Sequence, residues 1–209
     1  MKQAVIHQKV LGMVATNCYI CMHADTKEAF IVDPADNAAE IIRMVSDMGA
    51  VPCAVLLTHG HFDHIGAADE LRKTYEIPVY AHEAEEKVMA SASLNLSGSW
   101  ASPIHLKADH LLKDSDVLHI AGFTVRVMHT PGHTEGGCCY VLEDEEIVFT
   151  GDTLFCMSVG RMDFPGGSAS AMRHSIRRLL KELPENMHVL PGHGETTTIG
   201  YEKRSNPYA

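Results

Sequence analysis

Short apolar runs separated by polar or turn-forming residues recur along this chain, and each run is typical of a strand. The N-terminal third contains three such runs in succession, and the pattern returns after residue 116. The run at residues 54–57 is short and wholly apolar, which predicts a strand buried on both faces. The predicted strands cover residues 4–10, 18–22, 29–32, 54–57, 78–81, 117–120, 123–128, 138–142, 147–149 and 189–190.

Apolar residues at helical spacing fill several of the intervals between these strands. Asn37 is expected to cap a helix that continues to about Met48, because Gly49 follows as a typical end signal. Ser168 or Ser170 is expected to begin a helix of about fourteen residues. Two further helices are expected over residues 65–75 and 83–90.

Strands and helices alternate in both halves of the chain, and no linker separates the halves. The strand–helix–strand succession over residues 54–81 implies parallel pairing. Two sheets packed face to face, with helices on the outside, would bury all of these apolar faces. We therefore expect an α/β (α+β) protein whose residues 1–209 form a single domain.

The segment over residues 91–103 is rich in Ser and Gly and holds Trp100, the one tryptophan of the chain. Long polar loops that carry a few apolar residues often cover a binding site, so the segment could act as a lid. Alternatively, it is a surface loop whose tryptophan fills a small cluster of its own. The sequence does not decide between the two interpretations.

Composition limits the class of protein. Of 209 residues, 45% are apolar and 21% are charged, as in ordinary soluble domains. No apolar run approaches the roughly 18 residues of a membrane span, and the N-terminus lacks the features of a secretory signal. A cytoplasmic protein with no membrane partner is therefore the expectation. The net charge of −10 argues against a nucleic-acid partner, because phosphate binding needs a basic face.

The six cysteines are expected to be buried structural thiols. Cys18 and Cys21 lie three residues apart in a predicted strand, so they should face opposite sides of the sheet and form no redox or zinc pair. The adjacent Cys138 and Cys139 should point apart for the same reason.

Candidate metal ligands are concentrated directly after the buried strand at residues 54–57. His59, His61, Asp63 and His64 fall within six positions there. His59 and His61 should point to the same side of an extended segment, because side chains alternate along a strand. Asp63 and His64 should follow on the turn that starts the next helix, aimed at a second point nearby. The spacing therefore indicates two neighbouring metal positions.

Three further candidates appear where later apolar strands end. They are His133, Asp152 and His193, and each lies beside a glycine that permits close approach of the backbone. Because open α/β sheets place their ligand sites at the carboxyl ends of strands, the seven side chains should converge on one sheet edge. The other nine histidines are expected to be structural.

These motifs resemble those of the metallo-β-lactamase superfamily of metal-dependent hydrolases over essentially the whole chain. The stretches at residues 151–155, 160–168, 191–194 and 198–207 are similar to those of its single-domain branch related to glyoxalase II. The resemblance implies a four-layer αβ/βα sandwich of two mixed sheets. It also implies one metal ion held by His59, His61 and His133, and a second held by Asp63, His64 and His193. Asp152 would bridge both ions.

Imidazole and carboxylate ligands without thiolate suit zinc, iron or manganese, and ligand type alone does not choose among them. Two divalent ions are expected, with zinc named first and iron or manganese as alternatives. Two such ions about 3.5–4 Å apart make hydroxide available near neutral pH. A thiolate leaves without a strong general acid, which favours a thioester over an amide. Together with this preference, the resemblance to glyoxalase II implies hydrolysis of a small thioester such as S-lactoylglutathione by a metal-bridging hydroxide. Asp63 is the candidate catalytic residue that orients this hydroxide.

Candidate substrate contacts are Arg161, Lys203, Arg204 and Tyr208, although Arg161 could equally pair with Asp163. The alternative function is a persulfide dioxygenase with one iron ion, which would act on glutathione persulfide and leave His64 and His193 without a metal. A scaffold stabilised by metal is a third hypothesis. The acidic charge disfavours a nuclease, the cytoplasmic interpretation disfavours a lactam hydrolase, and the oligomeric state is not predicted.

Overall fold

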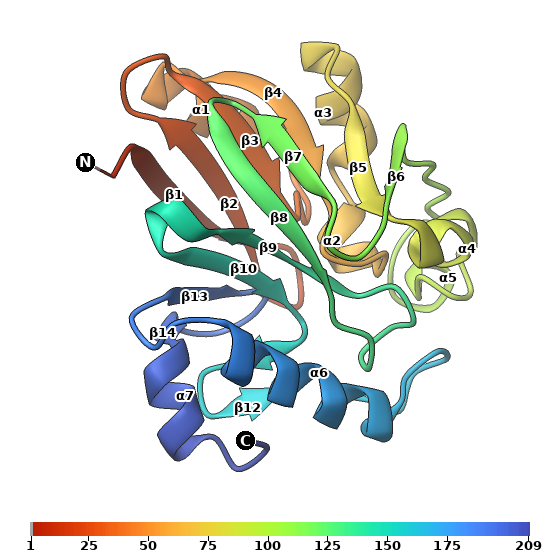
Figure 1. The fold of residues 1–209 in the computed structure, drawn as a ribbon. Coiled ribbons are helices and arrows are strands. Elements are labelled where there is room, and N and C mark those ends of the chain that lie inside the picture. The colour runs from red at the N-terminus through yellow and green to blue at the C-terminus, as the bar shows by residue number, and fades with distance from the viewer. Residues whose placement is uncertain (1) are drawn as a thin grey trace.

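In a computed structural model, which describes residues 2–209, two six-stranded sheets dominate the protein (Figure 1). The first sheet contains β1 (Ala4–Leu11), β2 (Thr16–His23), β3 (Glu28–Val32), β4 (Val51–Leu56), β5 (Val79–His82) and β6 (His110–Leu112), in that order. The second has the order β14 (Thr197–Thr198), β13 (His188–Pro191), β10 (Ile147–Gly151), β9 (Cys138–Leu142), β8 (Phe123–His129) and β7 (Val117–Ile120). A two-stranded sheet pairs β11 (Leu154–Phe155) with β12 (Ser158–Val159).

Both large sheets mix parallel and antiparallel pairs. In the first sheet, β1 to β3 pair antiparallel, whereas β3 to β6 pair parallel. In the second, β7 to β10 and the β13–β14 pair are antiparallel, and only β10 and β13 are parallel. The predicted parallel pairing across residues 54–81 is confirmed by β4 and β5.

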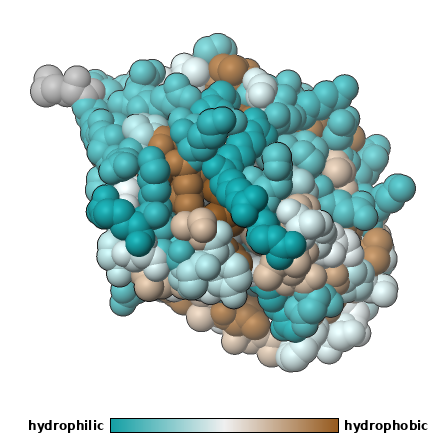
Figure 2. Space-filling model, turned by 60° about the horizontal axis from the view of Figure 1, so that its bottom comes forward, coloured by the Kyte–Doolittle hydropathy of each residue, from teal (hydrophilic) through white to brown (hydrophobic). Residues whose placement is uncertain are grey.

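Helices cover the outer faces of the two sheets (Figure 1). Apolar residues of α1 (Ala38–Met48) and α3 (Ala68–Tyr75) pack on the first sheet, and those of α6 (Ala169–Glu182) pack on the second. A third buried cluster, which includes Phe30 and Phe149, fills the space between the sheets. The predicted α/β class, with two mixed sheets between outer helices, is confirmed. On the face drawn in Figure 2, hydrophilic residues predominate and apolar residues show only in narrow strips and patches.

The predicted helix caps are confirmed. The Asn37 side chain accepts a hydrogen bond from the Glu40 backbone N–H, and Gly49 ends α1 in the left-handed conformation. Of the two serines proposed for α6, Ser168 is the cap, since its side chain accepts from the Ala171 backbone N–H.

The single helix predicted over residues 65–75 is confirmed only in part. Its C-terminal portion is α3, but its start is wrong, because the chain first forms a separate helix, α2 (Phe62–Ile65). The Ala67 backbone N–H donates to the Pro34 carbonyl, which diverts the chain between the two helices. The prediction for residues 83–90 divides into the 3₁₀ turn η1 (Glu83–Glu85) and α4 (Glu86–Ala90). Several short elements were not predicted. They are the helices α5 (Ser97–Trp100) and α7 (Ile199–Ser205), the 3₁₀ turn η2 (Glu143–Glu145) and the strands β6, β11, β12 and β14.

Four of the cysteines are buried as predicted. Cys18 and Cys21 enter different core clusters on opposite sides of the first sheet, as their spacing requires. Cys138 and Cys139 are separated in the same way by the second sheet. The prediction is wrong for the remaining two, because Cys53 and Cys156 are only partly buried. Within residues 2–209, no helix has the length and apolarity that a membrane crossing requires.

Candidate metal centre

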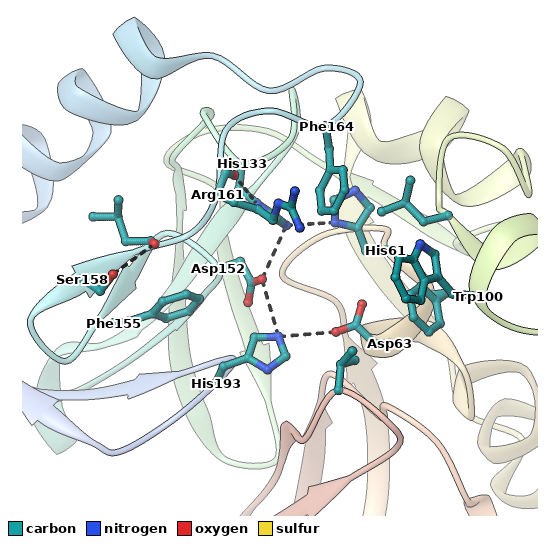
Figure 3. Close-up of a pocket in the computed structure, with 14 residues that line it drawn as sticks. His61, Asp63, Trp100, His133, Asp152, Phe155, Ser158, Arg161, Phe164 and His193 are labelled. Atoms are coloured by element: carbon teal, nitrogen blue, oxygen red, sulfur yellow. Dashed lines mark hydrogen bonds and ion pairs between the residues drawn. The ribbon is translucent and has the colours of Figure 1, made fainter.

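Four loops that follow strands bring the seven predicted ligands to one place. The loop after β4 carries His59 and His61 and leads directly into α2, which carries Asp63 and His64. The other three ligands follow β8, β10 and β13 in the second sheet. These three strands run in the same direction, so their carboxyl ends share one edge. Figure 3 shows His61, Asp63, His133, Asp152 and His193 facing one another.

The first group of side chains consists of His59, His61 and His133. One ligand atom from each lies within 4.8 Å of the others. The closest pair is His61 Nδ1 and His133 Nε2, which are 2.8 Å apart. The rings of His59 and His61 are nearly perpendicular, with centroids 4.9 Å apart. The set is the one that the family resemblance assigns to a first ion.

The second group consists of Asp63, His64 and His193, which also lie within 4.8 Å of one another. Asp63 Oδ2 is 3.4 Å from His64 Nε2 and 3.3 Å from His193 Nε2. The Thr16 hydroxyl donates to the same Asp63 oxygen at 2.8 Å. This is the set assigned by resemblance to a second ion.

The Asp152 carboxylate lies between the two groups. Its Oδ2 atom is 3.4 Å from His133 Nε2 in the first group and 3.6 Å from His193 Nε2 in the second. Its Oδ1 atom is 3.4 Å from His64 Nε2. One carboxylate therefore reaches both groups, which is the placement needed to bridge two cations.

Unpartnered atoms test whether cations fit here. Among the described residues, five buried side-chain nitrogen or oxygen atoms lack a hydrogen-bond partner, and four of them belong to His59, His61, His64 and Asp152. A buried polar atom without a partner is costly. Imidazole nitrogen and carboxylate oxygen are ligands for divalent transition metals. The residues present therefore fit two bound cations.

Asp33, which directly follows the strand predicted over residues 29–32, holds one ligand in place. Its Oδ2 atom lies 2.9 Å from His64 Nδ1 and accepts from the Thr58 hydroxyl at 2.6 Å. Its Oδ1 atom accepts from the Thr58 backbone N–H at 2.8 Å. The contact directs His64 Nε2 toward the centre. An acidic residue after an apolar strand was the available signal, as for Asp152.

Glu85 is a second residue that sequence reasoning missed. Its buried carboxylate accepts from the Gly60 backbone N–H at 2.7 Å and from the Gly136 backbone N–H at 2.8 Å. It thereby ties the loop of His59 and His61 to the loop of His133. No feature of the sequence around Glu85 marks this role.

Gly192 lets the backbone pass between two ligands. A Cβ atom there would lie 2.4 Å from Asp152 Oδ1 and 2.7 Å from His64 Cε1. Both distances are shorter than side chains tolerate, so only glycine fits without displacing a ligand.

The two groups differ in their protonation. Burial and neighbouring imidazoles hold the pKa of His59 well below its usual range and lower the pKa of His61 to about 3. Burial opposes protonation of His64 and His193 too, but nearby carboxylates outweigh it, raising the pKa of His64 to about 10 and also that of His193. Likewise, His64 and His193 outweigh burial and lower the pKa of Asp63. Cations would therefore displace protons mainly from the second group.

A cavity of about 410 Å³ opens over these side chains. Arg161 lines it, but its guanidinium also pairs with Asp163 through two hydrogen bonds of 2.7 Å. The structure does not bring the other predicted substrate contacts to the cavity wall. Lys203 and Arg204 lie on α7 and pair with Glu185. Tyr208 is exposed near the C-terminus and is not part of the lining.

The fold and the two ligand groups define a candidate centre for two divalent cations, and comparison with known proteins places it in a family. The family model for the metallo-beta-lactamase superfamily matches residues 11–193. The chain therefore belongs to this superfamily.

Two curated relatives extend over most of the chain. A probable metallo-hydrolase, YqgX, of Bacillus subtilis is 39% identical over 95% of this chain and 94% of its own length. The hydroxyacylglutathione hydrolase GloC of Haemophilus influenzae is 34% identical over 88% of both chains.

Solved structures give the same assignment. The chain is similar to the BLEG-1 B3 metallo-beta-lactamase, with a TM-score of 0.93 and 42% identity over 98% of this chain and 99% of that one. It is similar to TTHA1623 in a di-iron-bound form, with a TM-score of 0.86 and 33% identity over 97% and 100%. For ETHE1 from Myxococcus xanthus, the TM-score is 0.81 and the identity 29% over 97% and 83%.

Proposed function

We propose that this protein is a hydrolase that uses two divalent metal ions to cleave small thioesters of the S-lactoylglutathione type. The observation that carries the proposal is the position of Asp152, whose Oδ2 atom lies within 3.6 Å of a histidine nitrogen from each ligand group. The likeness to a hydroxyacylglutathione hydrolase supports the thioester substrate.

Each part of the chain has a separate role in this proposal. His59, His61 and His133 would hold one ion, and Asp63, His64 and His193 the other, with Asp152 shared. When bound, the two ions supply a water of lowered pKa and polarise a carbonyl oxygen. Asp63, which lines the cavity and accepts from the Thr16 hydroxyl, orients the attacking water. The cavity positions the thioester, whose thiolate departs without a general acid.

Zinc is the proposed metal, and iron or manganese would also suit ligand groups that contain imidazole and carboxylate without thiolate. The likeness to a protein solved in a di-iron-bound form keeps iron as the alternative metal. The proposed location is the cytoplasm, supported by the free thiols of all six cysteines.

Two other activities require separate tests. A persulfide dioxygenase with one iron ion would leave the second group without a function, and the convergence of Asp63, His64 and His193 supports two ions instead. The likeness to a B3 metallo-beta-lactamase at 42% identity makes lactam hydrolysis the second candidate.

The test begins with metal-free protein that is reloaded with zinc, iron(II) or manganese(II). Metal analysis should give two ions per chain, and the loaded protein should release thiol from S-lactoylglutathione. The same preparations are assayed for oxygen consumption with glutathione persulfide and for cleavage of a chromogenic β-lactam. His193→Ala should reduce the count toward one ion, whereas His174→Ala, on the exposed face of α6, should keep two. One ion per chain with oxygen consumption would refute the proposal, and lactam cleavage without thioester cleavage would replace it.

A further inference from the structure

We infer that the cavity selects thioesters that carry apolar groups on both sides of the scissile carbon–sulfur bond, with Trp100 as a specificity-determining residue. This inference rests on the thioester hydrolysis proposed above and defines its substrate class. It departs from glutathione conjugates, in which the thiol carries two carboxylates and an ammonium group.

Aromatic rings flank both ligand groups. The Phe164 ring lies against the first group, with its centroid 5.6 Å from that of His61. The Phe155 ring lies against the second group, 5.9 Å from His193. A thioester that lies across both ligand groups would therefore have an aromatic side chain near each of its two substituents. Figure 3 shows Phe155 and Trp100 on opposite sides of the ligands.

Trp100 is an aromatic side chain that the protein leaves to solvent at this cavity. It lines the cavity and is 59% exposed. Large exposed apolar side chains that surround a cavity are typical of binding sites. An apolar group placed against this ring would cover it, which is a favourable contact that a small polar lactoyl group cannot make.

The loop that carries Trp100 is held at its base by hydrogen bonds. The buried Asn95 side chain donates to the Met89 and Ile104 carbonyls and accepts from the Ser97 backbone N–H. The Asn95 carbonyl also accepts from the Phe62 backbone N–H, at the start of α2. The loop is therefore anchored to the helix that supplies two ligands, and the tryptophan ring has a defined place beside them.

Beyond the metal centre, the side chains of the cavity wall offer few partners to a thiol with several carboxylates. Arg161 is the one Lys or Arg side chain among the residues that line the main cavity, and Asp163 already pairs with it. Its guanidinium also lies 3.9 Å from the centroid of the Phe164 ring. Arg161 could offer a partner to one carboxylate at most, and only in competition with Asp163.

A second cavity of about 320 Å³ adjoins the first, and both are lined by Phe62 and Asp63. Met13 and Ile104 contribute apolar wall, and the lining has acidic but no Lys or Arg side chains. Besides Asp63, the acidic residue in the lining of this second cavity is Asp36. A substituent that extends past Asp63 therefore meets apolar wall and Asp36, with no Lys or Arg side chain to pair with a carboxylate.

The inference is tested with four thioesters that combine two acyl groups with two thiols. The acyl groups are lactoyl and phenylacetyl, and the thiols are glutathione and N-acetylcysteamine. The value of kcat/KM should be at least about tenfold higher for phenylacetyl than for lactoyl on the same thiol. It should also be higher for N-acetylcysteamine than for glutathione with the same acyl group.

Three variants identify the contribution of the tryptophan. Trp100→Ala should reduce the phenylacetyl-over-lactoyl ratio toward one, and Trp100→Phe should restore most of it. Leu111→Ala serves as the control, because Leu111 is a similarly exposed apolar residue on β6, outside the cavity. A ratio that is unchanged in Trp100→Ala would overturn the assignment of Trp100.

Binding is measured separately from turnover. Trp100 is the single tryptophan of the chain, so its fluorescence reports directly on this cavity. The thioether analogue of phenylacetyl-N-acetylcysteamine should shift its emission to shorter wavelength, and S-methylglutathione should not. If thioesters are cleaved but lactoylglutathione is preferred, the selectivity fails and the proposed function stands. If no thioester is cleaved, the proposed function fails. If both analogues or neither of them shift the Trp100 emission, the inferred selectivity for apolar groups is overturned.

Discussion

Replacing Asp33 by Asn should lower both the metal affinity of the second ligand group and the free energy of unfolding. The carboxylate is buried, accepts two hydrogen bonds from Thr58 and contacts His64 Nδ1 at 2.9 Å. Asn keeps the size of the side chain and tolerates the positive φ of 48° at this position. The substitution therefore changes hydrogen bonding and charge with little effect on the backbone.

The magnitude follows from counting donors. The Asn side chain has one oxygen and one NH₂ group, so in either orientation the NH₂ group faces the Thr58 backbone N–H or His64 Nδ1. A buried donor without an acceptor costs about 1–3 kcal/mol, and loss of a charged acceptor adds to it. We expect the free energy of unfolding to fall by about 2–4 kcal/mol. Loss of the contact between Asp33 and the metal-binding His64 should lower the affinity for the second ion by about 10–100-fold.

Two measurements on the metal-free and reloaded protein check this. Urea unfolding gives the change in stability, and competition with a zinc chelator gives the affinity of each ion. Asp144→Asn is the matched control, because Asp144 is exposed on η2, away from the centre. Reduced stability with an unchanged second-ion affinity would show that Asp33 supports the fold alone. No change in either quantity would refute the proposed hydrogen-bond network.

Three further predictions concern Gly192, Asp63 and His82. Gly192→Ala should cost at least one ion per chain by metal analysis, because its Cβ would lie 2.4 Å from Asp152 Oδ1. Asp63→Asn should lower kcat for thioester hydrolysis by about 10²–10⁴-fold, and near-normal turnover would exclude its role in orienting water. Burial and a stacked histidine lower the pKa of His82 to about 4. As the pH falls, His82 is therefore protonated in the unfolded chain before it is protonated in the folded protein. The free energy of unfolding should accordingly decrease by about 1 kcal/mol between about pH 6.5 and pH 4. Urea unfolding at pH 7.5 and 5 should show this loss in the wild type and less of it in His82→Gln.

The elements that could be predicted from the sequence are those whose signal is local. The α1 helix was predicted at both ends because its first turn is capped by Asn37 and its last is followed by Gly49, and both signals act within four residues. The break between α2 and α3 could not be predicted, because it depends on a hydrogen bond from Ala67 to Pro34 across the fold. Strands of two or three residues, such as β14 and β6, are too short to show a periodic pattern.

The same distinction applies to the centre. The seven candidate ligands follow apolar strands and carry their chemistry in their residue types, so the sequence indicated them. The role of Asp33 depends on Thr58, which is 25 residues away, and that of Glu85 on Gly136, which is 51 residues away. A lone carboxylate in a sequence does not reveal which distant backbone group it will accept from.

The cavity wall marks the limit of sequence reasoning for function. Two interpretations of residues 91–103 were open, and the one in which Trp100 fills its own small cluster is wrong, because the side chain is 59% exposed beside the ligands. Its position is set by Asn95, which bonds mainly to backbone groups that are present at any residue. The metal ligands and the Trp100 part of the cavity wall therefore depend on different segments of the sequence. Substitutions in this loop could change the substrate while every ligand is retained, so the metal-binding motif alone predicts the type of reaction but not the molecule on which it acts.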